Sequence, residues 1–182
     1  MRASFRSVWF LPGLGLVFWW AARLSIVGSL SFEMAIAFGS LVNFGLLLLI
    51  SFISDFQAQP YAHFAVRFKH NLRGAVIYGC LAAISVGVFH HVVAAEQTAF
   101  RKLEREQFIQ QSLSDADAFA VLQKTDPRLA AMDRETAKAR ALDSLRFQFD
   151  PRWHVTASLI LLVATAACCA LFATLMCGFL RS

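Results

Sequence analysis

The stretch Met34–Ser54, MAIAFGSLVNFGLLLLISFIS, is apolar along almost its whole length and carries no charged residue. A helix needs about 20 mostly apolar residues to cross a hydrocarbon core of about 30 Å. Three further windows are also mostly apolar, at about 8–28, 74–95 and 155–180, and the first of them carries one charge, Arg23. Lipid offers the backbone no hydrogen-bond partners, so all four windows are expected to be helical. The sequence therefore predicts an all-α integral membrane protein, built as a four-transmembrane-helix bundle.

The composition of the whole chain agrees with this prediction. Of its 182 residues, 58% are hydrophobic and 16% are charged, whereas soluble domains have about 45–50% and about 25%. A soluble domain of this size could not bury so much apolar surface, which argues against a water-soluble enzyme. Disordered chains and small disulfide scaffolds have different compositions. The chain also lacks the basic, aromatic-rich soluble surface of a nucleic-acid-binding protein, so no nucleic-acid partner is expected.

The first apolar window also has some features of a signal peptide. Arg2 and Arg6 precede it, as in the basic start of a leader. The apolar run is longer than the usual ~7–15 residues, however, and no clean Ala-x-Ala site ends it. We therefore expect it to be retained as a span, with Pro12 at the start of its helix or at a kink.

The basic residues outside 96–154 indicate the orientation, because Lys and Arg concentrate in short cytoplasmic loops. They lie mainly at the amino terminus, in the loop 55–73 and at Arg181. These segments predict that both termini are cytoplasmic, in the inner membrane of a bacterium. The polar segment 96–154 has equal numbers of acidic and basic residues. It is expected to form a helical periplasmic insertion between spans three and four.

Three helix starts are predicted near this insertion: at Ser114 as a cap, at Asp126-Pro127, and at Asp150-Pro151 for the last span. Apolar residues after the second start recur at three- or four-residue steps, as in an amphipathic helix. They are Leu129, Met132, Thr136, Ala139, Leu142, Leu145 and Phe149. This stripe has two interpretations, self-packing within the insertion or a docking face for a periplasmic partner or the membrane surface.

Four residues at the predicted periplasmic boundary are candidate metal ligands, namely His90, His91, Asp150 and His154. Glu96 is expected beside them. Imidazole and carboxylate groups together can bind zinc, although no recognised metal-binding spacing is present. The alternative is a set of interfacial histidines with Asp150 as a helix cap.

Arg23 and Glu33 are a second candidate site, for a lipid or another ligand, because an ionisable residue inside a span is costly and is usually paired or functional. The alternatives are that Arg23 reaches the headgroups or forms a structural pair with Glu33. Asn43 lies in the middle of the second span, where an interhelical hydrogen bond is expected. The spans contain few other polar residues, which argues against an ion or proton channel. A secondary transporter is not expected either, because the sequence lacks paired broken helices and internal repeats.

The layout also resembles a known family. The stretch Phe64–Lys69, FAVRFK, is rich in Phe and basic, and it leads through Leu72-Arg73-Gly74 into the third span. In this respect the chain resembles the bacterial four-pass inner-membrane proteins of the domain of unknown function 4199. The resemblance implies a fold and a location, and it implies no activity.

The sequence favours a non-catalytic membrane subunit or scaffold, since it contains no nucleophile elbow, phosphate loop or pair of catalytic acids. No cofactor is expected. The expected partners are the lipid bilayer and either another protein or further copies of the chain, bound through the periplasmic helices or the transmembrane faces. The alternative function is a lipid-, small-molecule- or metal-binding membrane module at the periplasmic boundary.

Overall fold

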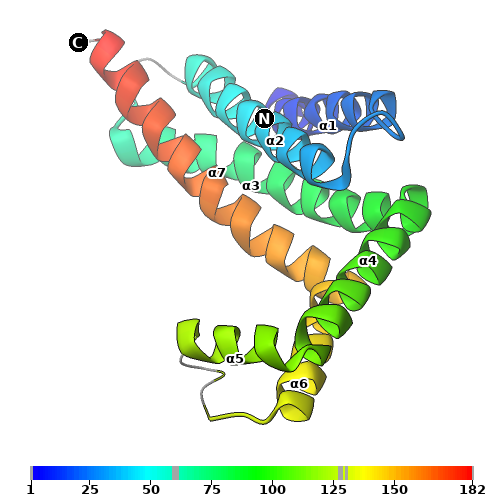
Figure 1. Cartoon of the computed structure of the whole chain (residues 1–182). Coiled ribbons are helices and arrows are strands. Elements are labelled where there is room, and N and C mark those ends of the chain that lie inside the picture. The colour runs from blue at the N-terminus through cyan, green and yellow to red at the C-terminus, as the bar shows by residue number, and fades with distance from the viewer. Residues whose placement is uncertain (1, 59–61, 127–128, 130, 182) are drawn as a thin grey trace. The chain divides into compact units, whose positions relative to one another are not determined.

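The computed structural model describes residues 2–58, 62–126, 129 and 131–181. These residues form helices and no strand, so the all-α prediction is confirmed (Figure 1). The elements are α1 (Arg2–Ser25), α2 (Phe32–Gln57), α3 (Phe64–Val88), the π-helical turn η1 (Phe89–Val93), α4 (Ala95–Ser114), α5 (Ala116–Thr125), α6 (Arg134–Gln148) and α7 (Pro151–Arg181). The chain divides into two compact units: unit 1 comprises Met1–Val88 and Val155–Ser182, and unit 2 comprises Phe89–His154.

Among the described residues, three helices are long and apolar enough to cross a membrane, Phe32–Gln57, Phe64–Val93 and Pro151–Arg181. The fourth predicted span lies in α1, which is not one of these three. Many large apolar side chains on the helices of unit 1 are exposed. Examples are Val17, Leu41, Ile160 and Phe179. Such a surface is unfavourable in water and suits contact with lipid, so a membrane environment is plausible.

Within unit 1, α3 packs against both α1 and α2, and it is the most enclosed of the three candidate spans. Small residues allow this close packing. Ala75, Ala82 and Ala83 are fully buried, and a Cβ atom on Gly79 would lie 3.4 Å from the carbonyl oxygen of Leu162 in α7. Small residues in α3 therefore let the backbones of neighbouring helices approach each other.

The ends of these helices differ from the sequence prediction. The predicted loop 55–73 is largely helical, because α2 continues to Gln57 and α3 begins at Phe64. Polar residues in this region are accommodated because they bind one another inside unit 1, as described below. Pro12 lies inside α1, which begins at Arg2, and so Pro12 does not mark the start of that helix.

Unit 2 has a small core of its own, formed by α4, α5 and α6. Its buried residues are Leu113, Phe119 and Ala137, and Ile109, Leu122, Leu129, Met132 and Ala141 pack against them. The caps differ from those predicted. Asp115 caps α5, accepting hydrogen bonds from the backbone N–H groups of Asp117 and Ala118, while Ser114 ends α4. The predicted start at Asp126-Pro127 is wrong for α6, which begins at Arg134 with Asp133 as its cap; Pro127 lies outside the described residues.

The predicted amphipathic stripe is correct only in part. Leu129 and Met132 contact the core of unit 2, and Leu145 is buried. Thr136 and Ala139 are exposed, however. The inward row of α6 is Ala137, Ala141 and Leu145, at four-residue steps. Alanines allow α6 to lie close to α4. Because alanine side chains are small and only weakly hydrophobic, the apolar pattern of the sequence did not indicate this face. Much of the stripe thus packs within unit 2.

Candidate functional site

Three histidines come together in unit 2. The Nε2 atom of His91 lies 2.8 Å from the Nδ1 atom of His154, a hydrogen-bond distance. The ring centroids of His90 and His154 are 5.8 Å apart. His90 is buried, while His91 and His154 are half-buried. The structure thus brings together three of the four residues that the sequence analysis named as candidate metal ligands.

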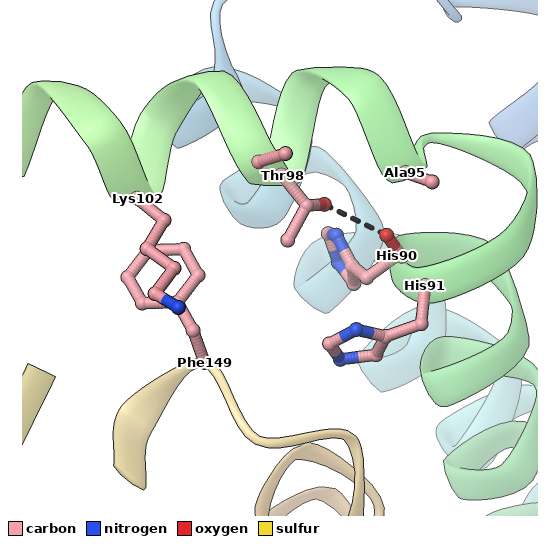
Figure 2. Close-up of a pocket in the computed structure, with 7 residues that line it drawn as sticks. His90, His91, Ala95, Thr98, Lys102 and Phe149 are labelled. Atoms are coloured by element: carbon pink, nitrogen blue, oxygen red, sulfur yellow. Dashed lines mark hydrogen bonds between the residues drawn. The ribbon is translucent and has the colours of Figure 1, made fainter. Parts of the chain in front are cut away.

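The π-helical turn η1 positions His90 and His91. The backbone N–H of Ala94 donates to the carbonyl of Phe89, five residues earlier, at 2.7 Å. Such a bond replaces the usual four-residue bond of an α-helix, and single π-turns are often found at functional sites. The Thr98 hydroxyl then donates to the carbonyl of His90 at 2.8 Å and fixes this turn against α4 (Figure 2).

The metal-site hypothesis gains no support from this geometry. Within the part of the chain that the structure describes, no group of three or more His, Cys, Asp or Glu side chains is arranged to hold a metal ion. His91 and His154 direct ring nitrogens at each other, which requires one ring to donate and the other to accept. Asp150 instead accepts a hydrogen bond from the backbone N–H of Arg152 at 2.7 Å, at the start of α7. Glu96 lies in the first turn of α4 and is exposed.

A pocket of about 180 Å³ lies beside the histidines. Its lining residues come from η1, from α4 and from the residue that follows α6. They are His90, His91, Ala95, Thr98, Ala99, Lys102 and Phe149. In Figure 2 Lys102 and Phe149 lie on one side of the view and the two histidines on the other. The Lys102 amine is 3.9 Å from a carboxylate oxygen of Glu106 and remains partly exposed.

The second candidate pair, Arg23 and Glu33, lies where α1 ends and α2 begins. Arg23 is only 2% exposed, so its side chain is buried within unit 1. Its guanidinium donates to the backbone carbonyl of Ala35 and lies 5.7 Å from the ring centroid of Trp19. Gly39 leaves room for it, since a Cβ atom there would lie 2.8 Å from Nη1 of Arg23. Glu33 lies in the first turn of α2 and is exposed.

The prediction for Asn43 is confirmed. The Tyr78 hydroxyl of α3 donates to the Asn43 side-chain oxygen of α2 at 2.7 Å, and both residues are buried. A similar bond joins α1 to α3, where the Trp20 indole donates to the Ser85 hydroxyl at 3.2 Å. These polar side chains link neighbouring helices.

A larger polar network was missed by the sequence reasoning. The guanidinium of Arg67 in α3 binds the carboxylate of Asp55 in α2 through two bonds, of 3.1 and 2.6 Å. Arg67 also donates to the carbonyl of Thr174 in α7 at 3.1 Å. Arg67 and Asp55 are both buried, and Asp55 has no exposed surface. This is a two-point ion pair that joins two candidate spans and contacts a third.

Asn71 extends the network. Its amide nitrogen lies 2.9 Å from Oδ1 of Asp55 and 2.8 Å from the Thr174 hydroxyl oxygen. Arg181 at the end of α7 donates to the backbone carbonyl of Asp55 at 2.9 Å. The network therefore lies where α2 ends, where α3 begins and where α7 ends.

A signal for this network exists in the sequence. Arg67, Asn71, Ala75 and Tyr78 recur at three- or four-residue steps, which places them on one face of a helix. The basic residues before Gly74 were instead interpreted as part of a cytoplasmic loop. The helix was therefore not extended from Gly74 toward Arg67.

These features define a class: an all-helical protein with three candidate membrane spans and a smaller helical unit that carries a histidine-lined pocket. Comparison with models of known protein families, with curated proteins and with solved structures finds no match.

Proposed function

We propose that this protein is a non-catalytic integral membrane scaffold or subunit. In this proposal α1 is a fourth span, both termini are cytoplasmic, and unit 2 lies in the periplasm of a bacterium. The basic residues near the start of α3 and the end of α7 support that orientation. The Phe-rich opening of α3 is also the stretch that resembles the domain of unknown function 4199, and we keep membership of that family as part of the proposal.

The observation that carries the scaffold proposal is the use of the buried polar groups in unit 1. Asp55, Arg67 and Asn71 bind one another and Thr174, and Asn43 binds Tyr78. Transporters and channels use intramembrane polar groups along a pathway. Here these groups link helix to helix, which favours a rigid anchor over a path for ions or substrates.

Unit 2 is the part that such an anchor would present to a partner. It has its own core and a charged, mostly helical surface. Large apolar side chains also remain exposed on α4 and α5, among them Phe100, Phe108 and Val121. A partner protein or a second copy of the chain would cover part of this surface.

The test is the mass of the complex released from native membranes. The chain is expressed at its native level, extracted in a mild detergent and analysed by native mass spectrometry. A defined complex is expected, with a fixed ratio of this 20.2 kDa chain to a partner or to further copies. Recovery of the 20.2 kDa monomer alone, in detergent and in nanodiscs, would contradict the proposal.

A further inference from the structure

We propose that the pocket of unit 2 binds a small organic anion, with the carboxylate of the ligand held by Lys102 and His91. This inference goes beyond the scaffold role and does not depend on it. The charge of the lining is the first argument. Lys102 and the imidazoles of His90 and His91 line the pocket, and the lining contains no carboxylate. Because Lys102 is the one charged residue among these described lining residues and no carboxylate lies among them, the pocket favours a negative group.

Lys102 is available for such a contact. Its amine lies 3.9 Å from Glu106, longer than a hydrogen bond, and its side chain is 40% exposed. An ammonium group has three donors, so it can bind a ligand carboxylate while it remains near Glu106. Lys102 lies one turn of α4 after Thr98, which the bond to the His90 carbonyl holds in place. The Lys102 side chain therefore projects from a part of α4 that is held against η1.

The opposite part of the lining contributes imidazole. The Nε2 atom of His91 is engaged with His154 at 2.8 Å, and this contact fixes the orientation of the His91 ring. In Figure 2 the His91 ring lies across the view from Lys102, with Phe149 beside the lysine. A carboxylate between Lys102 and His91 would meet the ammonium group on one side. On the other it would accept a hydrogen bond from Nδ1–H of His91, the tautomer in which Nε2 of His91 accepts from His154.

Size and apolar lining indicate the rest of the ligand. The volume of about 180 Å³ is smaller than the ~300–1,000 Å³ of typical drug-sized ligand sites, so only a small molecule fits. Ala95, Ala99 and the ring of Phe149 form the apolar part of the lining. Small-molecule sites combine apolar walls with a few placed polar groups. The matching ligand is a carboxylate with a small apolar or aromatic body.

The test uses the full-length protein in detergent and isothermal titration with benzoate, acetate, inorganic phosphate and the uncharged benzamide. We expect saturable binding of benzoate, with benzamide bound about tenfold more weakly because a charge-assisted hydrogen bond is lost. Lys102→Gln should weaken benzoate binding by about tenfold. The matched control, Lys124→Gln on the exposed surface of α5, should leave it unchanged.

A second variant tests the apolar wall. Phe149→Ala should weaken benzoate binding and leave acetate binding unchanged, because only benzoate has a ring to place against Phe149. The thermal unfolding of each variant, followed by circular dichroism, shows whether it is folded. Absence of saturable binding of both benzoate and acetate overturns the proposal, as does equal binding of benzoate and benzamide or an unaffected Lys102→Gln variant. If phosphate binds as tightly as benzoate, the pocket does not select an organic anion, and the proposed apolar body of the ligand is overturned.

Discussion

Asp55 in α2 and Arg67 in α3 show how two apolar helices accommodate a pair of buried charges. Each charge alone would be costly in a region of low polarity, and removing one member of a buried pair leaves the other without compensation. Two bonds join their side chains, and Asn71 donates a third to the carboxylate. The stability of unit 1 should therefore depend on the carboxylate of Asp55.

Asp55→Asn is expected to lower the free energy of unfolding by about 3–5 kcal/mol, because the charge of Arg67 stays buried without its partner. Thermal unfolding in detergent measures this effect. Asp143→Asn is the matched control, because Asp143 forms an exposed pair with Arg146 at 3.7 Å. Such pairs contribute about 0–1 kcal/mol. Equal effects of the two substitutions would contradict a structural role for the network.

Asp133, the cap of α6, is expected to make the stability of unit 2 depend on pH. Hydrogen bonds from the Thr136 side chain and backbone lower the pKa of the Asp133 carboxyl below its usual value. A group with a lowered pKa in the folded state stabilises the fold above its unfolded pKa, about 3.9. This stabilisation is lost as the pH falls through the folded value.

The acid side of the pH–stability profile of unit 2 should therefore become shallower in Asp133→Asn, which keeps a cap but removes the titrating group. Hydrogen exchange of the α6 amides from about pH 5 down to about pH 2 measures it, because the effect appears only below the unfolded pKa of about 3.9. The Asp143→Asn variant, whose carboxyl lies outside the cap, should keep the original slope. An unchanged slope in Asp133→Asn would show that Asp133 does not contribute.

At this scale the sequence predicted some partners and missed others. Asn43 was conspicuous because it is a single amide in an apolar run, and its interhelical bond to Tyr78 was predictable in kind. The ion pair of Asp55 and Arg67 was not predictable, because the sequence pattern of charges at the end of a span is the same whether they face solvent or each other. Only the packing of α2, α3 and α7 decides between these possibilities.

The helices of unit 1 depend on close packing at small residues. A Cβ atom on Gly87 in α3 would overlap the side chain of Val155 in α7, whereas a Cβ atom on Gly45 in α2 would meet nothing within 4 Å. The two glycines thus test the same substitution with and without a neighbour.

Gly87→Ala is expected to lower the free energy of unfolding by about 1–3 kcal/mol, the usual cost of overpacking. Gly45→Ala should be neutral or slightly stabilising, because alanine is a better helix former than glycine. Thermal unfolding in the same detergent measures both variants. A neutral Gly87→Ala would mean that α3 and α7 are less closely packed near Gly87.

In unit 2, the core residue Phe119 and the exposed residue Phe108 form a similar comparison. Phe119→Ala should lower the stability of unit 2 by about 3–5 kcal/mol, because it leaves a cavity among α4, α5 and α6. Phe108→Ala removes the same atoms from an exposed position and should have little effect on stability. Hydrogen exchange of the α5 amides distinguishes the two, and equal exchange would contradict the assigned core.

The helical character of each element was predictable, whereas several boundaries were not. Long apolar runs identify α2, α3 and α7 by composition alone. The start of α3 at Phe64 was missed because its first turns are basic. The register of α6 was missed because its inward row contains Ala137 and Ala141, which carry little hydrophobic signal.

For the whole molecule, the proposed topology predicts which side of the membrane each unit faces. Single cysteines are introduced at Ser144 and His63, both exposed, in a variant whose four native cysteines are replaced by alanine. A membrane-impermeant maleimide should label position 144 in intact cells with a permeabilised outer membrane. Position 63 should react only after the inner membrane is opened, and the reverse pattern would contradict the orientation.

The ion pair between α2 and α3 also has a consequence for how the chain enters a membrane. Asp55 and Arg67 are only 12 positions apart, so the ribosome delivers both before it reaches α7. If α2 and α3 insert as proposed, this hairpin can therefore neutralise its own charges as it enters the membrane. Thr174 and Arg181 arrive last, and they close a network that is already paired. In the proposed membrane topology, this order of synthesis would avoid placing an isolated charge in the bilayer at this site.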